Sequence, residues 1–287
     1  MQATRKSVQC ISPAGLHRMS YKEWGDPSNG KVLLCVHGIT RVSDDFDILA
    51  RSLADTYRVI CPDVVGRGQS DWLRNPQLYQ IPQYVGDMVS LLARINADTV
   101  DWFGTSMGGL IGMALASLPD NPVRKLILND VGPALNLDAI VRIGEYISQD
   151  VRFDTFDEAL AYIRAISLTF GPHTDAQWHK LASDVLRQNA DGKWIRHYDL
   201  GLAIPVMATT PEMAAAAQKM LWSAYDAIRC PTLLVRGSDS DLLTAEAAQQ
   251  MMLRGPCAKV IELAGVGHAP TFVQPDQIAI AREFLLG

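Results

Sequence analysis

The sequence predicts an α/β fold in which a core of strands and helices is interrupted by a helical segment. Two observations lead to this prediction. Short β-branched runs alternate with longer helical patterns near both ends of the chain. Between them, residues 134–221 show helical stretches and no convincing strand. We therefore expect a core domain built from residues 1–133 and 222–287, with an all-helical insert at 134–221.

The first part of the core is expected to open with an antiparallel pair at residues 7–11 and 16–24, joined by a turn at Pro13–Gly15. The continuous apolar run at 32–36 is typical of a strand buried on both faces. Further strands are predicted at 58–61, 99–103 and 125–128, and helices at 43–53, 84–95 and 106–118. In the insert, the clearest helices are 138–148, 157–167 and 174–188. After the insert, strands and helices alternate again, with strands at 232–236 and 259–262 and helices at 244–253 and 275–285.

Composition excludes several classes of protein. The 287 residues are 48% apolar, with 31 acidic and 26 basic side chains, a net charge of −5 and no lysine or arginine run. A nucleic-acid-binding body and a basic membrane patch are therefore not expected. Apolar runs of about 18 residues, which a membrane-spanning helix needs, do not occur. The five cysteines are odd in number and lack C-x-x-C spacing, so we expect free thiols and no zinc site. The N-terminus has no signal-peptide core, and we expect a cytoplasmic protein, monomeric or dimeric.

The most informative motif is Gly104-Thr105-Ser106-Met107-Gly108, a G-x-S-x-G pattern. A predicted strand runs into it and a predicted helix runs out of it, which is the context of a nucleophile elbow. The glycines relieve crowding where the chain reverses, and the hydroxyl of Ser106 is presented at a helix N-terminus. Ser106 is the predicted nucleophile.

A serine nucleophile needs a base and an acid that orients the base. In this architecture the order along the chain is serine, acid, histidine, and His268 is the one histidine after residue 197. The acid is expected in the loop after strand 232–236 or the loop after strand 125–128. Asp241 is our choice; Asp239 and Asp130 are the alternatives.

Two backbone N–H groups should bind the developing oxyanion. One belongs to Met107, directly after the nucleophile, and the other to Ile39, in the loop after the first parallel strand. Gly38 lets that loop approach the site closely. We interpret His37 as a structural histidine and not as a base. The glycine-rich segment 63–70 lacks both phosphate-loop patterns, so we interpret it as a tight structural turn.

These residues together resemble the α/β-hydrolase fold superfamily. The matching elements occur in family order and are His37-Gly38, Asp63-x-x-Gly66-x-Gly68-x-Ser70, Gly104-x-Ser106-Met107-Gly108-Gly109, the Gly237–Asp241 loop and Gly267-His268. The resemblance implies a mostly parallel eight-stranded sheet flanked by helices, with residues 134–221 as a helical cap. It also implies Ser106, Asp241 and His268 as a triad and Ile39 and Met107 as oxyanion donors. The acid loop departs from the family pattern, because its aspartate comes one residue later than usual.

The predicted function is hydrolysis of carboxylic esters of small or medium-sized, largely apolar acyl substrates, by a capped serine esterase that uses no cofactor and no metal. The segments 37–41 and 236–243 resemble bacterial carboxylesterase-type proteins, some of which hydrolyse short hydroxyalkanoate oligomers. Arg41 could meet an acidic substrate or form a surface salt bridge. Cap aromatics could line the pocket or pack within the cap; they are Trp178, Trp194 and Trp222. The alternatives are carbon–carbon bond hydrolysis, lactonase or perhydrolase activity, and a ligand receptor on a hydrolase scaffold.

Overall fold

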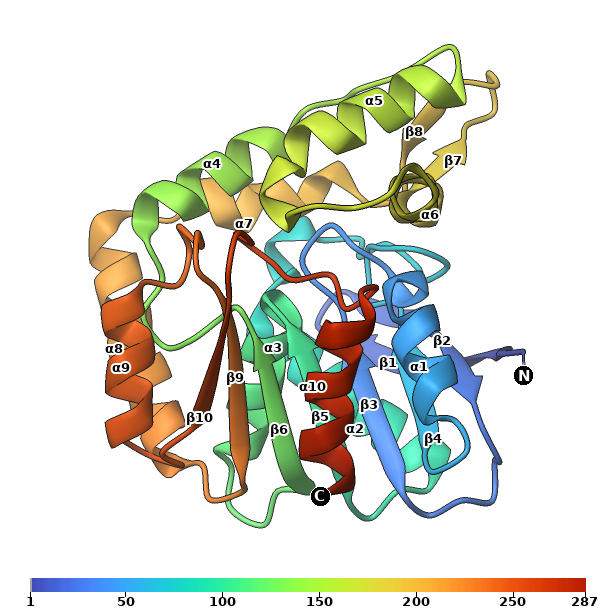
Figure 1. The fold of residues 1–287 in the computed structure, drawn as a ribbon. Coiled ribbons are helices and arrows are strands. Elements are labelled where there is room, and N and C mark those ends of the chain that lie inside the picture. The colour runs from blue at the N-terminus through green and yellow to red at the C-terminus, as the bar shows by residue number, and fades with distance from the viewer. Residues whose placement is uncertain (1) are drawn as a thin grey trace.

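The computed structural model describes residues 2–287, and its centre is one eight-stranded sheet (Figure 1). The strand order is β1-β2-β4-β3-β5-β6-β9-β10. The strands are β1 (Thr4–Ser12), β2 (Gly15–Trp24), β3 (Val32–Val36), β4 (Arg58–Pro62), β5 (Val100–Thr105), β6 (Val123–Asn129), β9 (Thr232–Gly237) and β10 (Lys259–Leu263). Strand β2 pairs antiparallel with both β1 and β4, and the pairs from β4 to β10 are parallel. The predicted mostly parallel eight-stranded sheet is confirmed.

Helices cover both faces of this sheet. One face packs against α1 (Asp47–Leu53) and α10 (Pro275–Leu286), and Figure 1 shows α10 crossing in front of the strands. The other face packs against α2, α3, α8 and α9. Their bounds are α2 (Ile81–Ile95), α3 (Met107–Ala116), α8 (Pro211–Ala227) and α9 (Ala245–Leu253). All five residues of β3 are buried, which explains why its sequence is apolar without alternation.

The insert lies across the end of the sheet that faces upward in Figure 1. Its helices are α4 (Leu137–Ile147), α5 (Phe156–Ile166), α6 (Asp175–Val185) and α7 (Ala203–Met207). Short 3-10 turns occur in it at Leu168–Phe170 and Leu200–Leu202, and in the core at Ser43–Phe46 and Pro76–Leu78. The three helices predicted in the insert are therefore present.

Two details of the predicted insert need correction. It is not all-helical, because β7 (Leu186–Gln188) pairs antiparallel with β8 (Trp194–Arg196). Strands of three residues are too short to show a period of two in a sequence. In addition, the expected boundary at residue 221 falls inside α8, which packs against α3 of the core. The alanine-rich sequence of α8 gives no apolar stripe that would have shown which domain it covers.

The five cysteines are free, as expected, and Cys10, Cys35 and Cys61 are buried. Within the described part of the chain, no single helix is long and apolar enough to cross a membrane; a bent pair, Leu200–Met207 and Pro211–Ala227, passes on length and composition alone.

Candidate active site

Ser106 lies at the sharp turn between β5 and α3. Its φ of 50° and ψ of −115° are strained for a residue with a side chain. The neighbouring glycines make this turn sterically feasible. A Cβ on Gly104 would lie 2.3 Å from the Gly108 carbonyl oxygen, and a Cβ on Gly108 would lie 2.0 Å from that of Val36. The predicted elbow is therefore present, and it presents Ser106 at the carboxyl end of the sheet.

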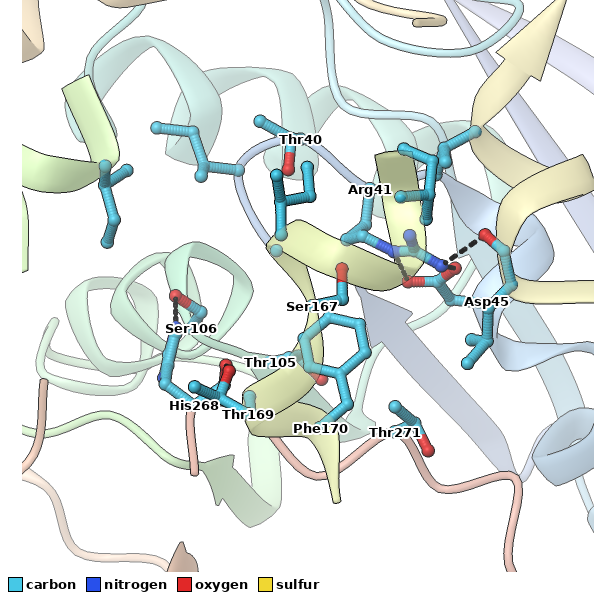
Figure 2. A pocket seen from close by; sticks show the side chains of 18 of the residues that line it. Thr40, Arg41, Asp45, Thr105, Ser106, Ser167, Thr169, Phe170, His268 and Thr271 are labelled. Carbon is cyan, nitrogen blue, oxygen red and sulfur yellow. Dashed lines mark hydrogen bonds and ion pairs between the residues drawn. The ribbon is translucent and has the colours of Figure 1, made fainter. Parts of the chain in front are cut away.

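A chain of two hydrogen bonds starts at this serine. His268 Nε2 lies 2.9 Å from Ser106 Oγ, and His268 Nδ1 lies 2.7 Å from Asp130 Oδ2. Because a carboxylate only accepts hydrogen bonds, the Nδ1–H donates to Asp130 and Nε2 faces the serine hydroxyl as an acceptor. This is the orientation that a histidine needs in order to take a proton from serine. Figure 2 shows Ser106 and His268 at the cavity wall.

Asp130 is fully buried and directly follows β6. Its Oδ1 accepts the backbone N–H of Gly237 at 2.9 Å, and its Oδ2 also accepts the hydroxyl of Ser240 at 2.6 Å. Its own N–H donates to the carbonyl of Val235 in the neighbouring strand β9. These bonds hold the carboxylate in one orientation behind the imidazole, with its buried oxygens satisfied.

The prediction of Asp241 as the acid partner is wrong. Asp241 is exposed and pairs with Arg142 of α4 at 2.5 Å, and it does not reach His268. Asp239 is also exposed, and its Oδ1 accepts the hydroxyl of Ser238. Strands β6 and β9 are adjacent and parallel, so the loops that follow them start from the same edge of the sheet. Either loop could therefore supply the acid. The sequence contained one signal in favour of Asp130. In the loop after β9, Asp241 comes one residue later than the family pattern places the acid.

The loop after β3 is held close to the serine. A Cβ on Gly38 would lie 3.8 Å from the Ser106 Cβ. The Gly38 carbonyl lies 2.7 Å from His37 Nδ1 and accepts the Arg41 N–H at 3.1 Å. His37 Nε2 in turn accepts the Val64 N–H at 2.9 Å. Burial lowers the pKa of His37 to about 4, so the neutral ring donates through Nδ1 and accepts through Nε2. His37 is structural, as its position predicts.

This bonding pattern sets the direction of the Ile39 amide. The Gly38 carbonyl and the Ile39 N–H belong to one planar trans peptide and therefore point in opposite directions. Holding the carbonyl leaves the N–H directed away from it. Met107 is the first residue of α3, where the backbone N–H groups have no partner within the helix. Neither amide has a hydrogen-bond acceptor anywhere in residues 2–287, so both are available to an oxyanion.

A cavity of about 490 Å³ lies over Ser106, between the insert and the sheet. This volume is within the range of about 300–1,000 Å³ that is common for small-molecule sites. Its apolar lining comes from both domains and includes Ile39, Phe46, Ile143, Ile163, Ile166, Phe170, Leu181, Val185, Ala269 and Pro270. Ser106 and His268 form part of the wall, and Phe170 lies in the same view (Figure 2).

The three tryptophans predicted for the pocket do not line it. Trp178 packs in a small buried cluster with Leu181 and Val273. Trp194 on β8 packs edge-on against Phe156. Trp222 lies on α8, where the Arg254 guanidinium is 4.2 Å from its ring centroid. These large rings pack outside the cavity, whose apolar wall is mostly aliphatic and whose phenyl and phenol rings are those of Phe46, Phe170, Tyr146 and Tyr198. No periodic signal in the sequence distinguished these roles.

Three arginines and two aspartates line the cavity. Arg41 is in the wall as predicted, but its salt bridge is not at the surface: its Nε and Nη2 bind the Asp45 carboxylate at 2.7 and 2.6 Å, and Nη2 also donates to the Leu181 carbonyl (Figure 2). Arg142 and Asp241 form the second pair. Arg196 binds the carbonyls of Tyr146 and Gln149 and has no carboxylate partner among the described residues. The wall therefore carries an excess of positive charge.

A match to a family model decides the relationship of this chain to known proteins. Residues 33–281 match the model of the alpha/beta hydrolase family, and this range contains Ser106, Asp130 and His268. The chain belongs to the alpha/beta hydrolase family. The predicted fold and family are confirmed.

Relatives of this alpha/beta hydrolase cover nearly its whole length. It is 56% identical over 283 residues to a 3-hydroxybutyrate-oligomer hydrolase of Cupriavidus necator, covering 98% of this chain and 97% of that protein. A putative hydrolase from Rickettsia typhi is 30% identical, with a TM-score of 0.88 over 100% of this chain and 99% of its own. An alpha/beta hydrolase from Novosphingobium aromaticivorans is 33% identical, with a TM-score of 0.87 over 100% and 99% of the two chains. The family match and the similarity to the Cupriavidus necator protein confirm the prediction that the chain is an ester hydrolase.

Among the described residues, a buried cluster of potential metal ligands lies outside the site of this hydrolase. Cys10, His17 and Asp87 bring potential metal-ligand atoms within 4.8 Å of one another, on the β1–β2 hairpin and α2. However, His17 Nε2 lies 3.0 Å from both carboxylate oxygens of Asp87. His17 Nε2 and the carboxylate thus satisfy each other, while His17 Nδ1 has no partner among the described residues. We interpret the cluster as a buried link between hairpin and helix.

Proposed function

We propose that this hydrolase cleaves carboxylic esters through an acyl-enzyme, with Ser106 as nucleophile, His268 as base and Asp130 as the acid that orients it. The observation that carries the proposal is the Ser106–His268–Asp130 chain of hydrogen bonds at the wall of a cavity large enough for a small ester. Small-molecule partners, a cytoplasmic location and a monomeric or dimeric state stay predictions.

The geometry supports the following mechanism. Ser106 Oγ attacks the ester carbonyl carbon while its proton moves to His268 Nε2. The carbonyl oxygen becomes an oxyanion, which the N–H groups of Ile39 and Met107 bind. As the carbon–oxygen bond to the alcohol breaks, His268 gives its proton to the departing oxygen. Water then attacks the acyl-enzyme, again losing a proton to His268, and the acid leaves as Ser106 regains its proton. Asp130 keeps the imidazole tautomer and stabilises the imidazolium throughout.

For the substrate, we propose short oligomers of a hydroxy acid such as 3-hydroxybutyrate. The relative from Cupriavidus necator is named for such oligomers, and it covers nearly the whole chain. Each unit of the oligomer has a small apolar branch, and the oligomer ends in one carboxylate. The aliphatic lining of the cavity suits the branches, and its excess of arginine over aspartate suits the carboxylate.

Two assays test the proposal. The first measures hydrolysis of p-nitrophenyl esters from acetate to laurate by the wild type, Ser106→Ala and the control Ser117→Ala at the other end of α3. The second follows cleavage of the 3-hydroxybutyrate dimer and trimer by chromatography. We expect Ser106→Ala to lose at least about a thousandfold in kcat/KM while Ser117→Ala stays near wild type.

The alternatives give different results in these assays. Carbon–carbon hydrolysis predicts turnover of a vinylogous diketone with little ester cleavage, and a lactonase prefers a cyclic ester to the open dimer. A ligand receptor predicts binding that survives Ser106→Ala. Equal activity of wild type and Ser106→Ala would refute the mechanism. Cleavage of aryl esters without cleavage of the oligomers would refute the substrate and leave the mechanism standing.

A further inference from the structure

Arg67 is a buried arginine in the turn between β4 and α2, between Gly66 and Gly68. Its side chain is fully buried, yet within residues 2–287 no carboxylate lies within salt-bridge distance of its guanidinium. A turn alone needs no arginine, and burying a charge without a partner of opposite charge is costly. The glycines explain the turn: φ is 88° at Gly66 and 54° at Gly68. They do not explain why a charged side chain is buried at this position.

The partners of Arg67 point to a role. Its Nε donates to the Ile39 carbonyl at 2.7 Å, and its Nη2 lies 3.2 Å from the Met107 sulfur. Its Nη1 donates to the Val65 carbonyl at 2.7 Å and to the Tyr84 hydroxyl at 3.0 Å. Ile39 and Met107 come from different segments, the loop after β3 and the start of α3. They are the two residues whose amides are proposed to bind the oxyanion.

We infer that Arg67 is a positioning residue for the oxyanion hole. One planar guanidinium fixes the Ile39 loop relative to the N-terminus of α3, and so sets the separation of the two N–H donors. This inference rests on the proposed serine mechanism. Arg67 does not line the cavity and therefore acts through Ile39 and Met107, without touching the substrate.

Arg67 complements His37 and does not duplicate it. His37 holds the Gly38 carbonyl, which orients the peptide that carries the Ile39 N–H. Arg67 holds the next carbonyl along the chain and ties it to α3. Its charge, unpaired in a site of low dielectric, also makes the potential behind the donors more positive. A preorganised positive site stabilises the oxyanion more than the neutral ester, so the effect appears in the transition state.

The test compares Arg67→Met, which keeps an unbranched apolar stem but removes the guanidinium and its charge, with Arg67→Lys, which keeps the charge but has a single nitrogen. Tyr84→Phe is the matched control, since it removes one bond to the same guanidinium and leaves the Ile39 and Met107 contacts. Active sites are counted with a fluorophosphonate, and kcat and KM are measured on p-nitrophenyl butyrate. The inhibition constant of a trifluoromethyl ketone, which forms an oxyanion adduct on serine, is the second readout.

We expect Arg67→Met to lose about a hundredfold in kcat per titrated site, the scale of one lost oxyanion donor, with KM changed by less than about threefold. The inhibition constant of the ketone should rise in parallel with the loss in kcat/KM. Arg67→Lys should fall between Arg67→Met and wild type, and Tyr84→Phe should stay within about threefold of wild type.

A merely structural role would give another pattern: fewer titrated sites and a lower Tm, with kcat per site and the ketone constant unchanged. That pattern would overturn the inference. If Arg67→Met does not fold, Arg67→Lys decides, and wild-type kcat per site with wild-type ketone binding in that variant would equally overturn it. Inactivity of Ser106→Ala together with full activity of the Arg67 variants would refute this inference alone. Full activity of Ser106→Ala would refute the mechanism beneath it.

Discussion

Asp130 and His268 lie 2.7 Å apart, although 138 residues separate them in the chain. The contact connects Asp130, directly after β6, with His268 in the loop after β10, and His268 in turn bonds Ser106. It makes Asp130, and not Asp241, the residue that can orient the imidazole.

Asp130→Asn should therefore be severely impaired. An amide can offer Nδ1 a donor in place of an acceptor, which favours the wrong tautomer, and a loss of about 10⁴-fold in kcat is known for such a change in a serine protease. We expect a loss of about 10³-fold or more on p-nitrophenyl butyrate, measured per titrated active site. Asp241→Asn is the matched control and should stay within about threefold on this neutral ester. A larger loss in Asp241→Asn than in Asp130→Asn would reverse the assignment.

The sequence was sufficient for part of this site because part of it is local. Ser106 is defined by a strand, a glycine pattern and a helix that are contiguous, and His268 by its order in the chain. The choice between Asp130 and Asp241 depends on how two loops from adjacent strands run across one sheet edge, which is a tertiary property. The prediction that the cap tryptophans line the pocket was wrong for the same reason. Whether Trp178 faces the cavity or Val273 depends on how α6 docks, and helical periodicity does not contain that information.

Arg142 offers a test of how the substrate is recognised. It pairs with Asp241 at the cavity wall, and both side chains are about half exposed. A substrate carboxylate would compete with Asp241 for this guanidinium. We expect Arg142→Gln to raise KM for the 3-hydroxybutyrate trimer by roughly threefold to tenfold, and Asp241→Asn to lower it.

The methyl ester of the same trimer is the control substrate, and its KM should change little in either variant. The difference should shrink at high salt, because exposed charges are screened. Equal effects on the acid and on its methyl ester would show that Arg142 shapes the cavity without reading the carboxylate.

Asp184 on α6 gives a pH-dependent prediction. Burial raises its pKa to about 6, although Lys180 and Arg41 lower it, and Asp45 raises it further. A carboxyl whose pKa is raised in the folded state binds more protons than in the unfolded state. Its contribution to stability is therefore present below its unfolded pKa of 3.8 and is lost as the pH rises through about 6.

Asp184→Asn mimics the protonated form and should relieve this loss. We expect the difference in Tm, variant minus wild type, to grow between pH 5 and pH 8, by roughly 2–4 °C, the shift that about 1 kcal/mol causes in a chain of this size. Calorimetry across this range measures it. Asp175→Asn, at the exposed start of the same helix, should show no such trend. A difference that falls with pH would contradict the predicted sign.

Replacement by alanine should change the stability of the protein in opposite directions at Gly108 and Gly86. A Cβ on Gly108 would lie 2.0 Å from the Val36 carbonyl oxygen of β3, and this backbone atom cannot move without shifting the sheet. Gly108→Ala should therefore cost more than about 3 kcal/mol in the free energy of unfolding. It should also displace Ser106 and Met107, so that the folded fraction is poorly active.

Gly86 is exposed within α2, with nothing within 4 Å of an added Cβ. Gly86→Ala should stabilise the protein by about 0.5–1 kcal/mol, because alanine has the higher helix propensity. Urea unfolding of both variants measures the two signs, and a stable, active Gly108→Ala would show that α3 is not packed directly on β3.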